Sequence, residues 1–132
     1  MEIDRIDHIV LTVSDVEETI RFYTEVLGMR AVTFGDGRRA LAFGGQKINL
    51  HQAGSEFEPK AAHPTPGSAD FCLVTRKPLG EIMEHLVGRN VEVLQGPVER
   101  TGALGVMESV YIRDPDGNLV ELSCYPHGGE DM

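Results

Sequence analysis

The chain has 132 residues, 41% of them hydrophobic, which is enough for one globular domain that needs no disulfide or metal to fold. The 21 acidic residues against 12 Lys plus Arg give a formal net charge of −9, which repels nucleic acid and anionic bilayers and argues against both as partners. Every apolar run is far shorter than the roughly 20 residues of a membrane span, and no secretory leader opens the chain, so we expect a cytoplasmic protein.

An internal repeat organises the sequence. Residues 6–13 form an alternating apolar run that precedes a predicted helix and several short strands, and residues 68–75 begin the same succession. The repeat predicts an α+β fold of two βαβββ modules, at about 4–53 and 67–126, with their sheets curled into a cup. We expect one domain over 1–126, a connecting loop at 53–67, and a disordered tail at 127–132.

The first helix carries the strongest local signals. Ser14 and Glu17 have the spacing of a capping box, and Gly28 stands where a left-handed residue ends a helix, so we predict a helix over 14–27. Its apolar face consists of Val16, Ile20, Tyr23 and Leu27.

The remaining elements follow from alternation and turn residues. In the first module we predict strands at 30–34, 39–43 and 47–52. In the second we predict a helix from about Pro78 to Gly88, with Ile82, Met83, Leu86 and Val87 facing inward. Strands are expected at 91–94, 106–113 and 119–125, and residues 114–118 form a turn between the last two. The segments 53–67 and 95–105 are expected to be long loops that can close over the cup.

Polar residues occupy corresponding places in the two modules. His8 and Asp70 interrupt the apolar first strand of each module, and Asn49 and Glu121 correspond in the last strands. Period-two alternation predicts that His8, Asp70 and Glu121 face the cup. The residues expected to face the helices are Ile9, Leu11, Phe71, Leu73, Val120 and Leu122.

The two cysteines are expected to be small buried hydrophobic residues in strands. By alternation Cys72 points into the cup and Cys124 points away from it, which disfavours a disulfide between them.

Three segments together resemble a known superfamily. Residues 7–15 (DHIVLTVSD), residues 22–29 (FYTEVLGM) and residues 111–121 (YIRDPDGNLVE) resemble the vicinal oxygen chelate superfamily, which contains glyoxalases, bleomycin-resistance proteins and extradiol dioxygenases. The resemblance covers residues 4 to 126. Residues 49–51 and 57–64 are most similar to small glyoxalase-domain proteins, including bacterial ones described as virulence-associated.

The resemblance implies a divalent metal bound by the first and last strand of each module. Those positions hold His8, Asn49, Asp70 and Glu121 here. His8 and Glu121 have the usual ligand types of the family, whereas Asn49 and Asp70 depart from them.

His51 offers a different third ligand. It lies on the face of Asn49, roughly 6.5 Å further along the strand, so we expect His8, His51 and Glu121 to hold one ion of manganese, iron, nickel or zinc. Asp70 is then a fourth ligand, a base, or an acceptor that orients a histidine. The competing interpretations are that His8 is a structural histidine, that His51 borders the rim, and that Asp70 is a polar residue at a strand edge.

Substrate contacts are expected from Asn49, Lys60, His63, Arg100 and Tyr111. The three cationic or ionisable loop residues among them, Lys60, His63 and Arg100, would attract an anionic substrate if the loops close, although solvated side chains are the plainer interpretation.

We therefore predict a metal-dependent, glyoxalase-like homodimeric enzyme that acts on a small oxygenated molecule as a lyase, isomerase or transferase, through chelation of adjacent oxygens. Glu121 and Asp70 are the candidate catalytic residues. The alternatives are an extradiol dioxygenase and a metal-free protein that sequesters a cationic drug, as bleomycin-resistance proteins do. The excess of acidic residues suits sequestration, whereas the presence of both His8 and Glu121 disfavours it.

Overall fold

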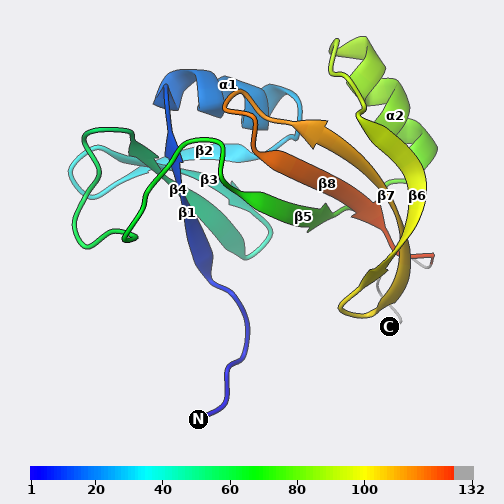
Figure 1. The fold of residues 1–132 in the computed structure, drawn as a ribbon, viewed down its shortest axis with the longest axis horizontal. Helices are drawn as coiled ribbons and strands as arrows, with labels where there is room; N and C mark the ends of the chain where they lie inside the picture. The colour runs from blue at the N-terminus through cyan, green and yellow to red at the C-terminus, as the bar shows by residue number, and fades with distance from the viewer. Residues whose placement is uncertain (127–132) are drawn as a thin grey trace. The chain divides into compact units, whose positions relative to one another are not determined.

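The computed structural model describes residues 1–126 and divides into two compact units, one of residues 1–68 and one that begins at residue 69. Each unit has the element order βαβββ (Figure 1). The first contains β1 (His8–Val13), α1 (Val16–Glu25), β2 (Arg30–Phe34), β3 (Arg38–Phe43) and β4 (Gln46–Gln52). The second contains β5 (Asp70–Val74), α2 (Leu79–Gly88), β6 (Gln95–Gly102), β7 (Gly105–Arg113) and β8 (Leu119–Cys124). The predicted α+β fold is confirmed, and the predicted tail at 127–132 lies outside the described residues.

The two sheets have the same topology. Their strand orders are β1-β4-β3-β2 and β5-β8-β7-β6, and in each the first and last strands of the unit pair in parallel. The remaining pairs are antiparallel. A parallel pair needs a long crossover connection, and the segment that contains the helix supplies it in each unit. Within residues 1–126 no helix is long and apolar enough to cross a membrane.

Alternation along the strands divides each sheet into two faces. In the first unit Leu11, Val13, Ile48 and Leu50 are buried with Ile20 and Tyr23 of α1. In the second unit the corresponding buried residues are Val110, Ile112, Val120 and Leu122, with Leu79 and Leu86 of α2. We call the opposite side of each sheet its open face. As predicted, His8, Asp70 and Glu121 lie on open faces.

The ends of the helices differ in detail from the predictions. The N-cap of α1 is Asp15, whose side chain accepts a hydrogen bond from the Glu18 amide at 3.1 Å, so the predicted capping box at Ser14 is wrong. Gly28 has φ of +70°, which confirms the left-handed residue after the helix. In α2, Pro78 is the N-cap rather than a helical residue, and Val87 is 70% exposed rather than inward.

The largest error of sequence interpretation is the segment before β7. The predicted strand at 91–94 is absent from the described structure, and the predicted loop at 95–105 is the strand β6 and its hairpin turn. Gly96, Pro97 and Gly102 indicated a loop. They are tolerated in β6 because it is the edge strand of its sheet and its pairing shifts register between Gln95 and Val98.

Gly96 is the residue that this irregular strand requires. Its φ is +118°, and a Cβ at this position would lie 2.5 Å from the Ser109 carbonyl oxygen and 2.9 Å from Val110 Cα. The backbones of β6 and β7 can approach this closely only because residue 96 has no side chain.

We predict that Gly96→Ala lowers the free energy of unfolding by about 2–4 kcal/mol, because it combines a left-handed backbone with a backbone clash. Chemical denaturation measures the change. Gly80→Ala is the control: its Cβ would meet nothing within 4 Å, and it should be neutral or slightly stabilising. Equal effects of the two substitutions would contradict the close approach described above.

Candidate functional site

His8 stands at the start of β1 on the open face of the first unit. Its side chain is 44% exposed, and Nδ1 lies 2.8 Å from Asp7 Oδ1. This hydrogen bond is the main reason that the pKa of Asp7 is lowered. Because Nδ1–H then donates to Asp7, the tautomer leaves the lone pair of Nε2 for a ligand, as in metal-binding histidines that are oriented by a carboxylate.

Asn49 and His51 lie two residues apart on the open face of β4, and both are buried at 7% and 3% exposure. Asn49 Oδ1 and His51 Nε2 are buried without a hydrogen-bond partner among the described residues. A buried polar atom without a partner costs about 1–3 kcal/mol. Two such atoms on neighbouring positions of one face make this surface a candidate binding site for a ligand or an ion.

The sheet register separates His51 from His8. His8 pairs with Lys47, Asn49 with Val10, and His51 with Thr12. His51 therefore lies four residues along the strand direction from His8, roughly 13 Å, whereas Asn49 lies two residues away. Of the two buried side chains, Asn49 is the one nearer to His8.

Charged groups of both signs surround His51. Phe57 packs edge-on against its ring at 5.5 Å between centroids, and the Arg38 guanidinium lies 4.5 Å from the Phe57 centroid. Burial lowers the pKa of His51 and the charge of Arg38 lowers it further, whereas Glu56 and Glu58 raise it and Lys60 lowers it. The imidazole is therefore neutral at pH 7.

Two predicted substrate residues of this unit are engaged elsewhere. Lys60 forms ion pairs with Glu58 at 3.2 Å and Glu56 at 3.6 Å, which raise its pKa. His63 is exposed, and its carbonyl oxygen accepts a hydrogen bond from the Thr65 hydroxyl.

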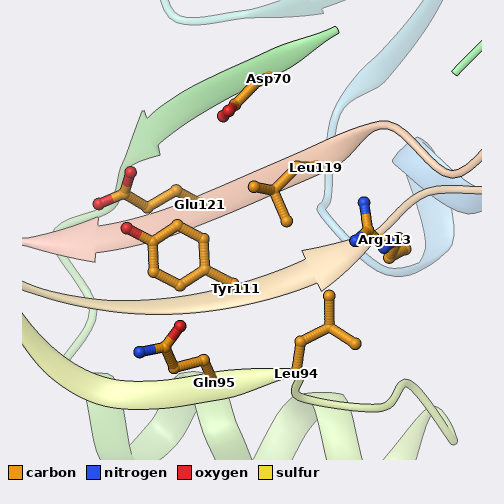
Figure 2. Close-up of a pocket in the computed structure, with 7 residues that line it drawn as sticks. All are labelled: Asp70, Leu94, Gln95, Tyr111, Arg113, Leu119 and Glu121. Carbon is orange, nitrogen blue, oxygen red and sulfur yellow. The ribbon is translucent and has the colours of Figure 1, made fainter. Parts of the chain in front are cut away.

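The open face of the second unit contains a pocket of about 660 Å³ (Figure 2). Glu121 and Tyr111 are register partners on β8 and β7, and Gln95 of β6 pairs with Tyr111. Figure 2 shows these three side chains across neighbouring strands, with Asp70 on the adjoining β5. The pocket is lined by Asp70, Leu94, Gln95, Tyr111, Arg113, Leu119 and Glu121. The predicted residues Asp70, Glu121 and Tyr111 thus share one pocket.

Two buried serines hold Glu121. Ser109 Oγ donates to Glu121 Oε2 at 2.6 Å, Ser123 Oγ lies 3.3 Å from the same oxygen, and the two hydroxyl oxygens are 2.6 Å apart. The Cys72 thiol lies 3.1 Å from Ser123 Oγ. Because a carboxylate only accepts, both serines direct their hydroxyl hydrogens toward Glu121, and the one hydrogen of Ser123 is shared between Glu121 Oε2 and Ser109 Oγ.

Arg100 is part of a strand rather than of a mobile loop. It lies on β6, where its Nε donates to the Tyr111 hydroxyl at 2.8 Å and its guanidinium carbon lies 5.4 Å from the Tyr111 ring centroid. Arg100 therefore positions Tyr111 beside the pocket.

Sequence reasoning did not identify several of these residues. Ser109 and Arg38 were missed because their place beside Glu121 and His51 depends on cross-strand register. Lys47 was detectable, since it lies two residues before Asn49 on the same face. Among residues 1–126, neither unit alone brings three His, Cys, Asp or Glu side chains together as a metal site. The predicted ligands His8 and His51 belong to the first unit, and Glu121 belongs to the second.

A family model, described as the Glyoxalase/Bleomycin resistance protein/Dioxygenase superfamily, matches residues 5–122. The chain belongs to this superfamily. It is 61% identical over 125 residues to the virulence protein STM3117 of Salmonella typhimurium, covering 95% of this chain and 87% of that protein. It is 53% identical to the glyoxalase domain-containing protein RDO1 of Mycosarcoma maydis, covering 95% and 70%. The crystal structure of STM3117 superposes with a TM-score of 0.94 and covers 95% of this chain and 99% of that one.

More distant superfamily relatives have names that denote different reactions. They include a metallothiol transferase of Staphylococcus epidermidis, a lactoylglutathione lyase of Arabidopsis thaliana and a catechol-2,3-dioxygenase of Bacillus subtilis, at 26–28% identity. The chain spans less than half the length of the last two. The superfamily therefore contains transferases, lyases and dioxygenases.

We predict that the two cysteines react slowly with iodoacetamide at pH 7.5, each under the influence of one carboxylate. The prediction from the sequence that both cysteines are buried is wrong, because Cys72 is exposed and Cys124 is half-buried. Partial burial of the thiol raises the pKa of Cys72, and Glu121 raises it further. Burial and Glu108 raise the pKa of Cys124. Since the thiolate is the reactive form, Glu121→Gln should accelerate alkylation of Cys72, and Glu108→Gln that of Cys124. Mass spectrometry measures the alkylation rate of each cysteine. If either substitution accelerated the alkylation of both cysteines equally, the prediction would be wrong.

We also predict that His51 makes stability depend on pH. Because its pKa in the folded protein is below the 6.5 of a free histidine, the unfolded chain takes up its proton first as pH falls. Stability is therefore full above pH 6.5 and decreases below it. In denaturation at pH 7.5 and 5.5, His51→Gln should lose less stability between the two pH values than the parent does. His63→Gln controls for removal of a histidine, and an identical pH response in all three proteins would refute the role of His51.

Proposed function

We propose that this protein is a metal-dependent enzyme of the glyoxalase-like class that acts on a small oxygenated molecule. The proposal depends on one observation, which is that hydrogen bonds hold the Glu121 carboxylate in place. Ser109 and Ser123 hold its Oε2, while Oε1 has no hydrogen-bond partner among the described residues, and the residue lines a pocket of about 660 Å³. A carboxylate fixed through one oxygen is suited to bind an ion or accept a proton through the other.

The residues fit a divalent ion by their chemistry. His8 is oriented by Asp7 with Nε2 available, Glu121 offers a carboxylate oxygen, and Asn49 Oδ1 is buried without a partner. Mixed nitrogen and oxygen donors suit manganese, iron, nickel or zinc. When bound, such an ion polarises neighbouring substrate oxygens and makes an adjacent C–H or a bound water more acidic.

Two sets of metal ligands are possible, and they differ in whether His51 or Asn49 is the third ligand. The sequence favoured His51, and the set His8, His51 and Glu121 remains the competing proposal. Two observations favour Asn49 instead: it is nearer to His8 in the sheet register, and Arg38 lies close enough to His51 to lower its pKa. A cation beside Arg38 is opposed by like-charge repulsion.

The chain's own groups supply the proton chemistry. Glu121 Oε1 is the proposed base, and its ionised state is stabilised by the hydrogen bonds that Ser109 and Ser123 direct to Oε2. Asp70, which lines the same pocket, is a second acceptor. Tyr111, fixed by Arg100, can donate its hydroxyl proton to a substrate oxygen.

Sequestration of a cationic drug is the less favoured function. The net charge of −9 attracts cations at long range. The open face of the first unit, however, holds Arg38 and Lys47, neither of which forms an ion pair within the described residues. Local repulsion there opposes a cationic ligand.

The metal proposal predicts one divalent ion per chain in calorimetric titration of chelator-treated protein with manganese or zinc. Loss of a ligand should weaken binding by about tenfold or more. We expect this loss in His8→Ala, Glu121→Gln and Asn49→Ala, and a much smaller effect in His51→Ala. The reverse order for Asn49 and His51 would restore the ligand set that the sequence favoured. His63→Ala is the matched control, and unchanged affinity in both His8→Ala and Glu121→Gln would refute the proposal.

A further inference from the structure

Two cations on the open face of the first unit are held by aromatic rings instead of carboxylates. The Arg38 guanidinium carbon lies 4.5 Å from the Phe57 ring centroid and 5.4 Å from that of Phe34. Lys47 Nζ lies 3.8 Å from the Phe34 centroid. All four residues belong to the first unit, and Arg38 pairs with Phe34 across β2 and β3.

Some of the other basic residues of the same unit have carboxylate partners, whereas Arg21 and Arg30 form no ion pair within residues 1–126. Arg39 pairs with Glu17, and Lys60 pairs with Glu56 and Glu58. Arg38 and Lys47 form no ion pair within residues 1–126, in a chain with 21 acidic residues and only 12 Lys plus Arg. The two charges on this face are therefore available to an anion from solution.

Aromatic contact positions these cations without consuming their hydrogen bonds. A ring that packs against a guanidinium occupies its flat face and leaves the N–H donors in the guanidinium plane. These donors match the two oxygens of a carboxylate. Between the two cations, β3 presents Ala40 and Ala42, opposite Asn49 and Lys47. Their short side chains allow Lys47 to extend across the sheet to Phe34.

Uncharged polar groups complete this surface. His51 pairs with Thr12 on β1, contacts the Phe57 ring that Arg38 also contacts, and has a buried Nε2 without a partner. Asn49, two residues before it, has a buried Oδ1 without a partner. Because Asn49 Oδ1 can only accept, a ligand that satisfies both atoms needs a hydroxyl next to its anionic group.

We propose that Arg38 and Lys47 bind the carboxylate of a small organic acid, whose neighbouring hydroxyl donates to Asn49 Oδ1 and accepts from His51 Nε2. The inference rests on the proposed function in that it names the substrate class of the same enzyme. Its contacts, however, come from the first unit alone and require no metal. The two proposals can therefore fail separately.

Glycolate, a carboxylate next to a hydroxyl, is the probe. Chelator-treated protein is titrated with glycolate, glycolamide or inorganic phosphate at constant ionic strength, and binding is followed by ¹H–¹⁵N chemical shifts. We expect saturable shifts at residues 38, 47, 49 and 51 with glycolate, and binding weaker by about tenfold or more with glycolamide, which has the same shape without the charge. Equal binding of glycolamide, or tighter binding of phosphate, would overturn the proposal.

Variants locate the site. Arg38→Gln and Lys47→Gln should each weaken glycolate binding by about tenfold, whereas Arg38→Lys should restore part of it. Arg21→Gln is the matched control, because Arg21 is exposed on α1 of the same unit and its loss changes the net charge equally. Thermal unfolding of each variant confirms that it is folded. Equal losses in Arg21→Gln and Arg38→Gln would show a nonspecific charge effect and refute the site.

The metal-ligand variants separate this proposal from the proposed function. Glu121→Gln should still bind glycolate in chelator-treated protein, since Glu121 makes none of the proposed glycolate contacts. Intact glycolate binding in a protein that binds no divalent ion would refute the metal proposal and leave the anion site standing. Metal binding without glycolate binding would refute the anion site and leave the metal proposal standing.

Discussion

The parallel pairing of the first and last strand in each unit is the constraint on which the candidate site depends. This pairing places His8, Val10 and Thr12 beside Lys47, Asn49 and His51, and it places Asp70 and Cys72 beside Leu119 and Glu121. A shift of one residue would turn every one of these side chains to the helix side. The packing of buried aliphatic residues against α1 and α2 opposes such a shift, so the apolar core sets the positions of the polar groups.

One topology carries different chemistry in the two units. On the open face of the first unit are two cations and two neutral polar groups that lack partners. The open face of the second unit has the carboxylate of Glu121, which receives hydrogen bonds from the buried Ser109 and Ser123. Corresponding positions show the divergence: His51 corresponds to Ser123, and Asn49 to Glu121. The repeat thus fixes where functional side chains stand, and the residue types decide what each face binds.

The sequence predicted what depends on local order along the chain. Alternation identified the faces of His8, Asp70 and Glu121, and Gly28 marked the end of α1. It did not predict relations that depend on cross-strand register, such as Arg38 beside His51 or Ser109 beside Glu121. It also misassigned β6, because glycine and proline indicate a loop, whereas an edge strand with a register shift accommodates both.

Glu121 and His51 illustrate opposite solutions to the burial of polar groups. The carboxylate of Glu121 is satisfied internally at one oxygen, so the cost of its desolvation is offset by hydrogen bonds from Ser109 and Ser123. His51 Nε2 has no such partner among the described residues, and burial keeps its imidazole neutral. A buried nitrogen without a partner costs stability, and a ligand that bonds to it offsets that cost. Binding at this face and folding of the first unit are therefore thermodynamically linked through one nitrogen atom.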